Sequence, residues 1–130
     1  MHSTDITRQT LEADEQIAYS SAINCLASQP SQLDQTLYPG AINRYMDFAV
    51  IHINRTLEMH IDGFFNTWHR MFVHLFEQEL QTQCGYTGVH PYWNWVETQE
   101  MGLVNSKMFD GSATSMSGDG AYNASAAPWS

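Results

Sequence analysis

The chain has 130 residues, enough for one domain with a modest hydrophobic core. Its 14 acidic residues outnumber 5 basic ones, giving a formal net charge of −9. This balance argues against nucleic acid as a partner, because binding to phosphates depends on basic surfaces. The chain has no apolar run of about 18 residues, so we expect no membrane-spanning helix.

The N-terminal residues 1–10 are polar, and we expect them to be loosely held. They lack the apolar segment of a secretory signal peptide, so the localisation stays open. A first helix is predicted from about Thr10, a candidate N-cap, to about Ser28, because Leu11, Ala18, Ala22 and Leu26 recur at helical spacing. Prolines and a glycine then indicate a loop over residues 29–40.

Two longer helices are predicted next, over about residues 41–57 and 64–83. The first has an apolar face made of Ile42, Tyr45, Ala49, His52 or Ile53, and Thr56. The second carries a stripe at helical spacing made of Phe65, His69, Phe72, Phe76 and Leu80. Gly85 suits the position just past its end. Residues 102–130 are rich in Gly, Ser, Asn and Ala and are predicted to be a loop-like or disordered tail.

His52, His60 and His69 are the candidate metal ligands. On one unbroken helix each step between them would span about 12–13.5 Å, too far for one ion with nitrogen bonds of about 2 Å. Asp62 and Gly63 predict a turn directly after His60. One histidine can then project from each helix and one from the turn, so that three imidazoles converge.

A single histidine on an apolar helical face is more often a core residue than a ligand, and only the combination of three favours a metal site. Imidazole binds copper, zinc, iron and nickel, so the spacing does not select the metal. We expect His2, His74 and His90 to lie away from this site.

Two motifs in this region carry a family resemblance. Trp68-His69-Arg70 and the block Pro91-Tyr92-Trp93-Asn94-Trp95, together with His60, Phe65 and Cys84-Gly85-Tyr86, resemble the first copper-site half of the tyrosinase and catechol oxidase family of type 3 copper proteins, most closely its fungal branch. The similarity extends back to Tyr19 and Cys25-Leu26 and forward to residues 109–112, and so covers most of the chain.

The resemblance implies an all-α fold, a partial helical bundle of the tyrosinase-like copper domain. It implies copper bound by His52, His60 and His69, with Phe65 packing beside the ligands and Trp68 in a supporting structural position. It also suggests a disulfide between Cys25 and Cys84, with two buried thiols as the alternative. On this basis residues 1–130 form a single partial copper-binding domain.

The sequence departs from the family pattern at two points. Some members have a cysteine two residues before the second histidine, joined to a histidine of the site by a thioether; here that position is Glu58. A type 3 centre also needs a second copper with three more histidines, and no histidine follows His90. We therefore expect a truncated or fragmentary member, with at most one copper site and little activity alone.

The function implied by the resemblance is oxidation of o-diphenols, and potentially monophenols, to quinones by dioxygen, with a small phenol and dioxygen as partners. A mononuclear copper-binding module without turnover and a metal-free structural remnant are the alternatives. Helix faces left uncovered by a missing half would favour self-association. Secretion would fit the family. Asn54-Arg55-Thr56 and Asn123-Ala124-Ser125 match the N-glycosylation pattern, which often arises by chance and is meaningful only in a secreted protein.

Overall fold

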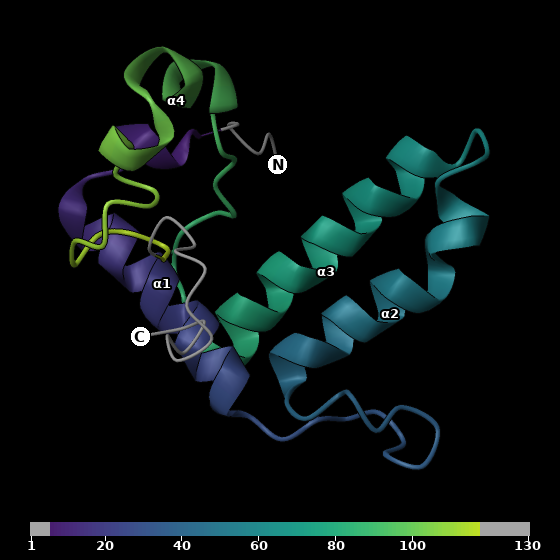
Figure 1. Ribbon diagram of the computed structural model, residues 1–130. Coiled ribbons are helices and arrows are strands. Elements are labelled where there is room, and N and C mark those ends of the chain that lie inside the picture. The colour runs from purple at the N-terminus through teal and green to yellow at the C-terminus, as the bar shows by residue number, and fades with distance from the viewer. Residues whose placement is uncertain (1–5, 118–130) are drawn as a thin grey trace. The chain divides into compact units, whose positions relative to one another are not determined.

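The computed structural model describes residues 6–117, which form four α-helices, two short 3-10 helices and no strand (Figure 1). The helices are η1 (Arg8–Thr10), α1 (Ala13–Ser28), α2 (Arg44–Met59), α3 (Phe65–Cys84), α4 (Trp95–Met101) and η2 (Leu103–Asn105). The predicted all-α fold class is therefore confirmed. Among the residues described, none of the helices has the length and apolar character that a membrane span requires.

The chain divides into two compact units. Residues 21–90 form one, and the described residues 6–20 and 91–117 belong to the other. α1 contributes to both units, whereas α2, α3 and the three candidate ligands lie entirely in the unit of residues 21–90. Each unit is described below by itself.

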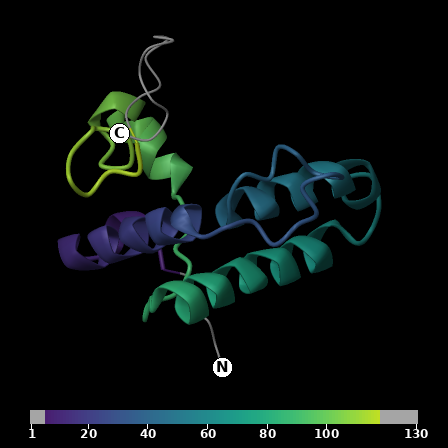
Figure 2. The same cartoon turned by 90° about the horizontal axis from the view of Figure 1, so that it is seen from below.

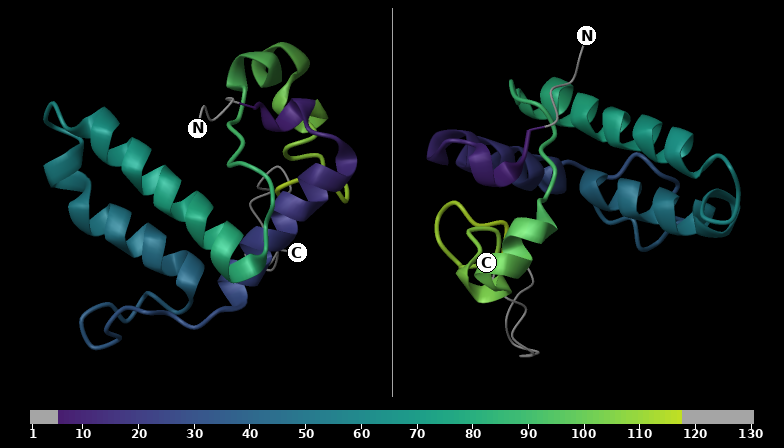
Figure 3. Two further views of the ribbon diagram at one scale, coloured as in Figure 1. Left: turned by 180° about the vertical axis from the view of Figure 1, so that it is seen from behind. Right: turned by 90° about the horizontal axis from the view of Figure 1, so that it is seen from above.

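α2 and α3 form an antiparallel pair. The two helices lie side by side in all views (Figures 1, 2 and 3). The predicted aromatic stripe of α3 packs against α2 through edge-to-face ring pairs. The ring centroid of Phe48 lies 5.6 Å from that of Phe72 and 5.2 Å from that of Phe76, and the centroids of Tyr45 and Phe76 are 6.2 Å apart. This geometry is favourable for aromatic pairs. The ring contacts also determine which face of α2 is turned towards α3.

The helix ends follow local capping chemistry. α2 begins at Arg44, later than predicted, because the Asn43 side chain accepts a hydrogen bond from the Met46 backbone N–H at 2.9 Å. α3 ends at Cys84, where Gly85 adopts a left-handed φ of 65° and donates its N–H to the Leu80 carbonyl. The predicted helices are thus present with shifts at their ends.

A buried carboxylate fastens the loop before α2 to the helix pair. Asp47 is fully buried and accepts hydrogen bonds from Ser31 Oγ at 2.6 Å, the Gln32 backbone N–H at 2.8 Å and Arg44 at 3.1 Å. Arg44 also forms an ion pair with Glu79 of α3 at 3.0 Å. The hydrogen bond to Glu79 contributes most to raising the pKa of Arg44, and Asp47 adds to it against the opposing effect of burial.

A disulfide joins α1 to the end of α3. The Cα atoms of Cys25 and Cys84 lie 5.9 Å apart, within the range that such a bond requires. Leu26 and Leu80, one on each of these helices, are fully buried in the same unit.

The other unit departs from the sequence expectation at its start. Residues 6–10 are held in place: Arg8 N–H donates to the Tyr92 carbonyl at 2.9 Å, and Tyr92 N–H donates to the Ile6 carbonyl at 3.1 Å. The Arg8 side chain is buried and donates to Ser20 Oγ and the Thr114 carbonyl. The expected loose N-terminus therefore does not describe residues 6–10, because a buried guanidinium needs fixed acceptors.

α4 was not predicted, although its start has a recognisable signal. The Asn94 side chain accepts from the Glu97 backbone N–H, an N-cap arrangement. After η2 the described residues 106–117 contain no further helix or strand. The remaining part of the predicted tail, residues 118–130, lies outside the described residues.

Candidate metal centre

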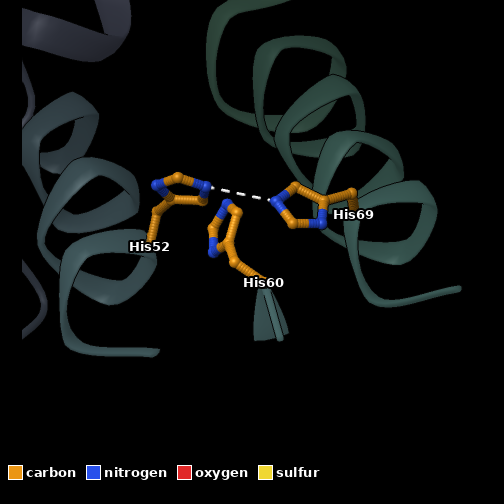
Figure 4. Close-up of side chains that lie close together, drawn as sticks. All are labelled: His52, His60 and His69. Carbon is orange, nitrogen blue, oxygen red and sulfur yellow. Dashed lines mark hydrogen bonds between the residues drawn. The ribbon is translucent and has the colours of Figure 1, made fainter. Parts of the chain in front are cut away.

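The structure brings the imidazoles of His52, His60 and His69 together. Their ligand nitrogens all lie within 4.8 Å of one another, and the Nε2 atoms of His52 and His69 are 3.2 Å apart (Figure 4). His52 projects from α2, His69 projects from α3, and His60 is the C-cap residue directly after α2. The side chains point towards a common centre, as the turn and the helical phase predict.

His60 is positioned by the last turn of α2. Its backbone N–H donates to the Thr56 carbonyl at 3.1 Å, and its ring Nδ1 lies 2.8 Å from the same oxygen. The Thr56 hydroxyl donates to the His52 carbonyl at 2.8 Å. Thr56 therefore connects the backbone of one candidate ligand to the ring of another.

The ring hydrogen bonds select the tautomer that a metal needs. Because a carbonyl can only accept, Nδ1 of His60 must donate to Thr56, and Nδ1 of His69 must donate to the Phe65 carbonyl at 2.7 Å. In a neutral ring the lone pair then lies on Nε2. A backbone carbonyl on the far nitrogen is the usual orienting partner of a metal-bound histidine.

The separations are close to those around a single ion. Three nitrogens bonded at about 2.0–2.1 Å in a trigonal or tetrahedral arrangement lie about 3.3–3.6 Å apart. The Nε2 atoms of His52 and His69 are already near this separation. The distances from the His60 ligand nitrogen to the other two are at most 4.8 Å, so these three atoms would need to move only a little closer to bind one ion. The residues present therefore fit one metal ion with three imidazole ligands. Such a donor set suits copper among other transition metals.

The electrostatics also favour the metal-binding form of His52. Burial lowers the pKa of its imidazole, and the neighbouring rings of His60 and His69 lower it further. A lowered pKa keeps the ring neutral at neutral pH, and only the neutral ring has a free lone pair.

Aromatic rings pack against the three imidazoles. The ring centroid of Phe65 lies 4.2 Å from that of His69 and 5.3 Å from that of His60. Trp68 lies 4.9 Å from His69 and 5.9 Å from His52, and stacks on Phe72 at 4.9 Å. Trp68 is half-buried, but Phe65 is 42% exposed. The expected packing of Phe65 and Trp68 beside the ligands is therefore present, with Phe65 more open to solvent than Trp68.

The other histidines do not join this group. His74 is exposed on α3. His90 is half-buried, its ring lies 5.5 Å from that of Phe76, and burial lowers its pKa against the opposing charge of Glu77. His2 lies outside the described residues. Glu58 forms an exposed ion pair with Arg55 at 2.8 Å.

Sequence reasoning missed the role of Thr56. The residue was placed on the apolar face of its helix, and its four-residue spacing from His52 is a sequence signal for the hydroxyl-to-carbonyl bond that Thr makes within helices. Its carbonyl contact with the His60 ring depends on where the helix ends, which sequence patterns give only to within a few residues.

Comparisons with known proteins identify the family to which the chain is similar. Residues 42–128 match the model of the common central domain of tyrosinase. Tyrosinase P of Aspergillus terreus is 42% identical over 118 residues, covering 91% of this chain and 33% of that protein. The tyrosinase-like protein orsC of Emericella nidulans is 41% identical over 123 residues, covering 93% and 33%.

One similar solved structure is that of a mutant polyphenol oxidase from Thermothelomyces thermophila. It superimposes with a TM-score of 0.85 at 40% identity, over 90% of this chain and 30% of that one. The chain therefore spans about a third of the length of these relatives.

Proposed function

The chain belongs to the tyrosinase family, and we propose that its 130 residues supply one of the two copper-binding halves of a phenol-oxidising domain. His52, His60 and His69 would hold the copper ion through Nε2. The observation that carries this proposal is the convergence of three imidazoles, two of which have Nδ1 engaged by backbone carbonyls.

The reaction we propose for the complete oxidase is oxidation of o-diphenols, and potentially of monophenols, to quinones with dioxygen. Converting a diphenol to its quinone removes two electrons and two protons, whereas one copper changes by one electron. Two copper ions are thus required, and the part of the chain that the structure describes offers one group of three histidines. The remaining ligands would come from residues beyond these 130.

In the proposed oxidase this copper-binding half would hold the ligands in position and offer an apolar surface beside them. The carbonyls of Thr56 and Phe65 hold the rings of His60 and His69, so the ligands need little reorganisation when the metal binds. Phe65 and Trp68 supply an apolar face beside the rings, where a phenol ring could pack.

A second candidate function is a copper-binding module without turnover. The single histidine group among the described residues favours it over a complete oxidase for this chain alone. The two functions differ in one measurement: both predict copper uptake, but only the oxidase proposal predicts turnover when the rest of a relative's domain is supplied.

Copper titration of the purified chain tests the proposal. We expect about one tightly bound ion per chain, a rise in melting temperature on binding, and no appreciable diphenol oxidation by the chain alone. His69→Ala should abolish both binding and the thermal shift. His74→Ala is the matched control, because His74 lies on the same helix but is exposed and outside the group, and it should bind as the unaltered chain does.

Two results would overturn the proposal. An unchanged copper affinity in His69→Ala would show that the three histidines do not form the copper site. Quinone formation that persists after free copper is removed and disappears in His69→Ala would show that the chain alone, or two copies together, forms a complete centre.

We also propose that the isolated chain self-associates. Apolar side chains near the candidate centre are strongly exposed, with Leu57 at 79%, Ile61 at 78% and Phe64 at 67%. Exposed apolar side chains on neighbouring positions favour association. Sedimentation analysis over a range of concentrations measures it, and a monomer throughout would contradict it.

A further inference from the structure

Asn54, the acceptor residue of the Asn54-Arg55-Thr56 pattern, lies on the side of α2 away from His52. Asn54 is exposed. An α-helix turns about 100° per residue, so Asn54 projects about 200° around the helix from His52, whose ring faces α3 in Figure 4. A group attached to Asn54 would therefore point away from the three histidines.

We propose that Asn54 carries an N-linked glycan. Three observations support it independently of the copper proposal. The tripeptide has Thr at its third position and no proline at its second. The acceptor side chain is exposed in the fold. The Cys25–Cys84 disulfide fits folding in an oxidising compartment, where N-glycosylation takes place.

The modification is a group transfer with a defined balance. The Asn54 amide nitrogen bonds to the anomeric carbon of an oligosaccharide carried on a lipid diphosphate. The bond between that carbon and the diphosphate breaks, the lipid diphosphate leaves, and the nitrogen loses one proton. The oligosaccharide donor is a general component of the secretory pathway.

Because the acceptor tripeptide lies within a helix of the folded chain, we infer that the glycan is transferred before α2 forms. The Thr56 hydroxyl donates to the His52 carbonyl at 2.8 Å, and the tripeptide lies within α2. A helical tripeptide with its hydroxyl already engaged is poorly presented to an enzyme that reads an extended acceptor. The glycan is thus added while residues 54–56 are unfolded, and α2 forms afterwards with the sugar outside.

The fold also gives the glycan a use. Leu57 is 79% exposed and lies three residues after Asn54, where side chains of a helix are surface neighbours. A bulky hydrophilic group at Asn54 would screen the Leu57 side chain from other molecules. The unglycosylated chain should therefore be less soluble.

Peptide mass spectrometry of the chain secreted from a fungal host tests the proposal. Enzymatic removal of the glycan in ¹⁸O-labelled water converts an occupied Asn54 to labelled Asp. We expect label at Asn54, and a gel-mobility shift that is lost in Asn54→Gln and in Thr56→Ala but kept in Thr56→Ser. Asn123→Gln separates any contribution from the second acceptor pattern. Copper uptake should be unchanged in Asn54→Gln.

A secreted, disulfide-bonded chain with unmodified Asn54 would overturn the proposal, as would a shift that persists in Thr56→Ala with Asn123→Gln. Where a variant fails to fold, cell-free translation into microsomes gives the same comparison on unfolded chains. Adding microsomes only after folding should leave the chain unmodified. Modification of the folded chain would contradict the proposed order of events.

Discussion

The two ends of the α2–α3 pair are held by different kinds of interaction. At one end the protein supplies its own links: Arg44 bridges Asp47 and Glu79, and a disulfide ties Cys84 to α1. At the other end three imidazoles converge, and the described residues form no ion pair or disulfide between α2 and α3 there. The first end is therefore linked by the protein's own charges and disulfide, whereas at the second end a metal ion bound by all three histidines would add a link.

Two ion pairs on α2 make the contrast measurable. Arg44–Asp47 and Arg55–Glu58 have the same three-residue spacing on the same helix. The side chains of the first pair are 14% and 0% exposed, and those of the second are 53% and 57% exposed. Burial, and not spacing, should therefore decide what each pair contributes.

Removing the disulfide should have the largest effect on stability. Cys25→Ser combined with Cys84→Ser opens a link spanning 59 residues. The chain-entropy estimate for a loop of this size is about 4 kcal/mol of unfolding free energy. Urea denaturation of the metal-free chain measures it. A loss below about 1 kcal/mol would mean that Leu26, Leu80 and the ion pairs hold this end without the covalent link.

Neutralising the buried carboxylate should rank second. Asp47→Asn keeps the size of the side chain but turns one acceptor oxygen into a donor that faces other donors. We expect a loss of about 2 kcal/mol, typical of a hydrogen bond to a charged group, from denaturation at neutral pH. A copper affinity unchanged within error would show that the two ends act independently. A large drop in copper affinity would instead mean that the rotation of α2, set at its buried end, positions His52.

Lowering the pH should destabilise both ends of the α2–α3 pair, by less than the loss of the disulfide or of the Asp47 carboxylate. Burial lowers the pKa of His90 and of His52 below the unfolded value of about 6.5. The unfolded chain then takes up protons first, so this stability is fully present above about pH 6.5 and is lost as the pH falls from there through the lower pKa values of the folded chain. His90→Gln should make the metal-free stability less dependent on pH while leaving copper uptake intact. An unchanged pH dependence would mean that the His90 ring is as easily protonated in the fold as outside it.

The sequence predicted the histidine end better than the buried end, for a physical reason. Helical periodicity fixes the direction of His52 and His69, and a turn signal near His60 supplies the third ring. Those features are local. Two partners of Asp47, Ser31 and Gln32, come from a loop 16 and 15 residues away, where no periodic pattern points to a contact with α2.

The unit of residues 6–20 and 91–117 illustrates the same limit. Arg8 reads as part of a polar N-terminus, but its acceptors include Ser20 and Thr114, separated from it by 12 and 106 residues. No periodic pattern links residues so far apart. α4 is different, because Asn94 and Glu97 form a capping signal that was present in the sequence but unused.

Neutralising the exposed pair should have the smallest effect. Glu58→Gln removes the ion pair with Arg55, but both side chains are more than half exposed, and water replaces the lost contact. We therefore expect no measurable change in melting temperature, in the same assay in which Asp47→Asn gives a clear one. Because Glu58 lies two residues before His60, copper affinity is the second readout, and it too should stay constant. A drop in affinity without a drop in stability would mean that Glu58 shapes the last turn of α2, where the Thr56 carbonyl holds the His60 ring. The histidine end would then have a protein-made link of its own, and the contrast with the buried end would be smaller than the two ion pairs indicate.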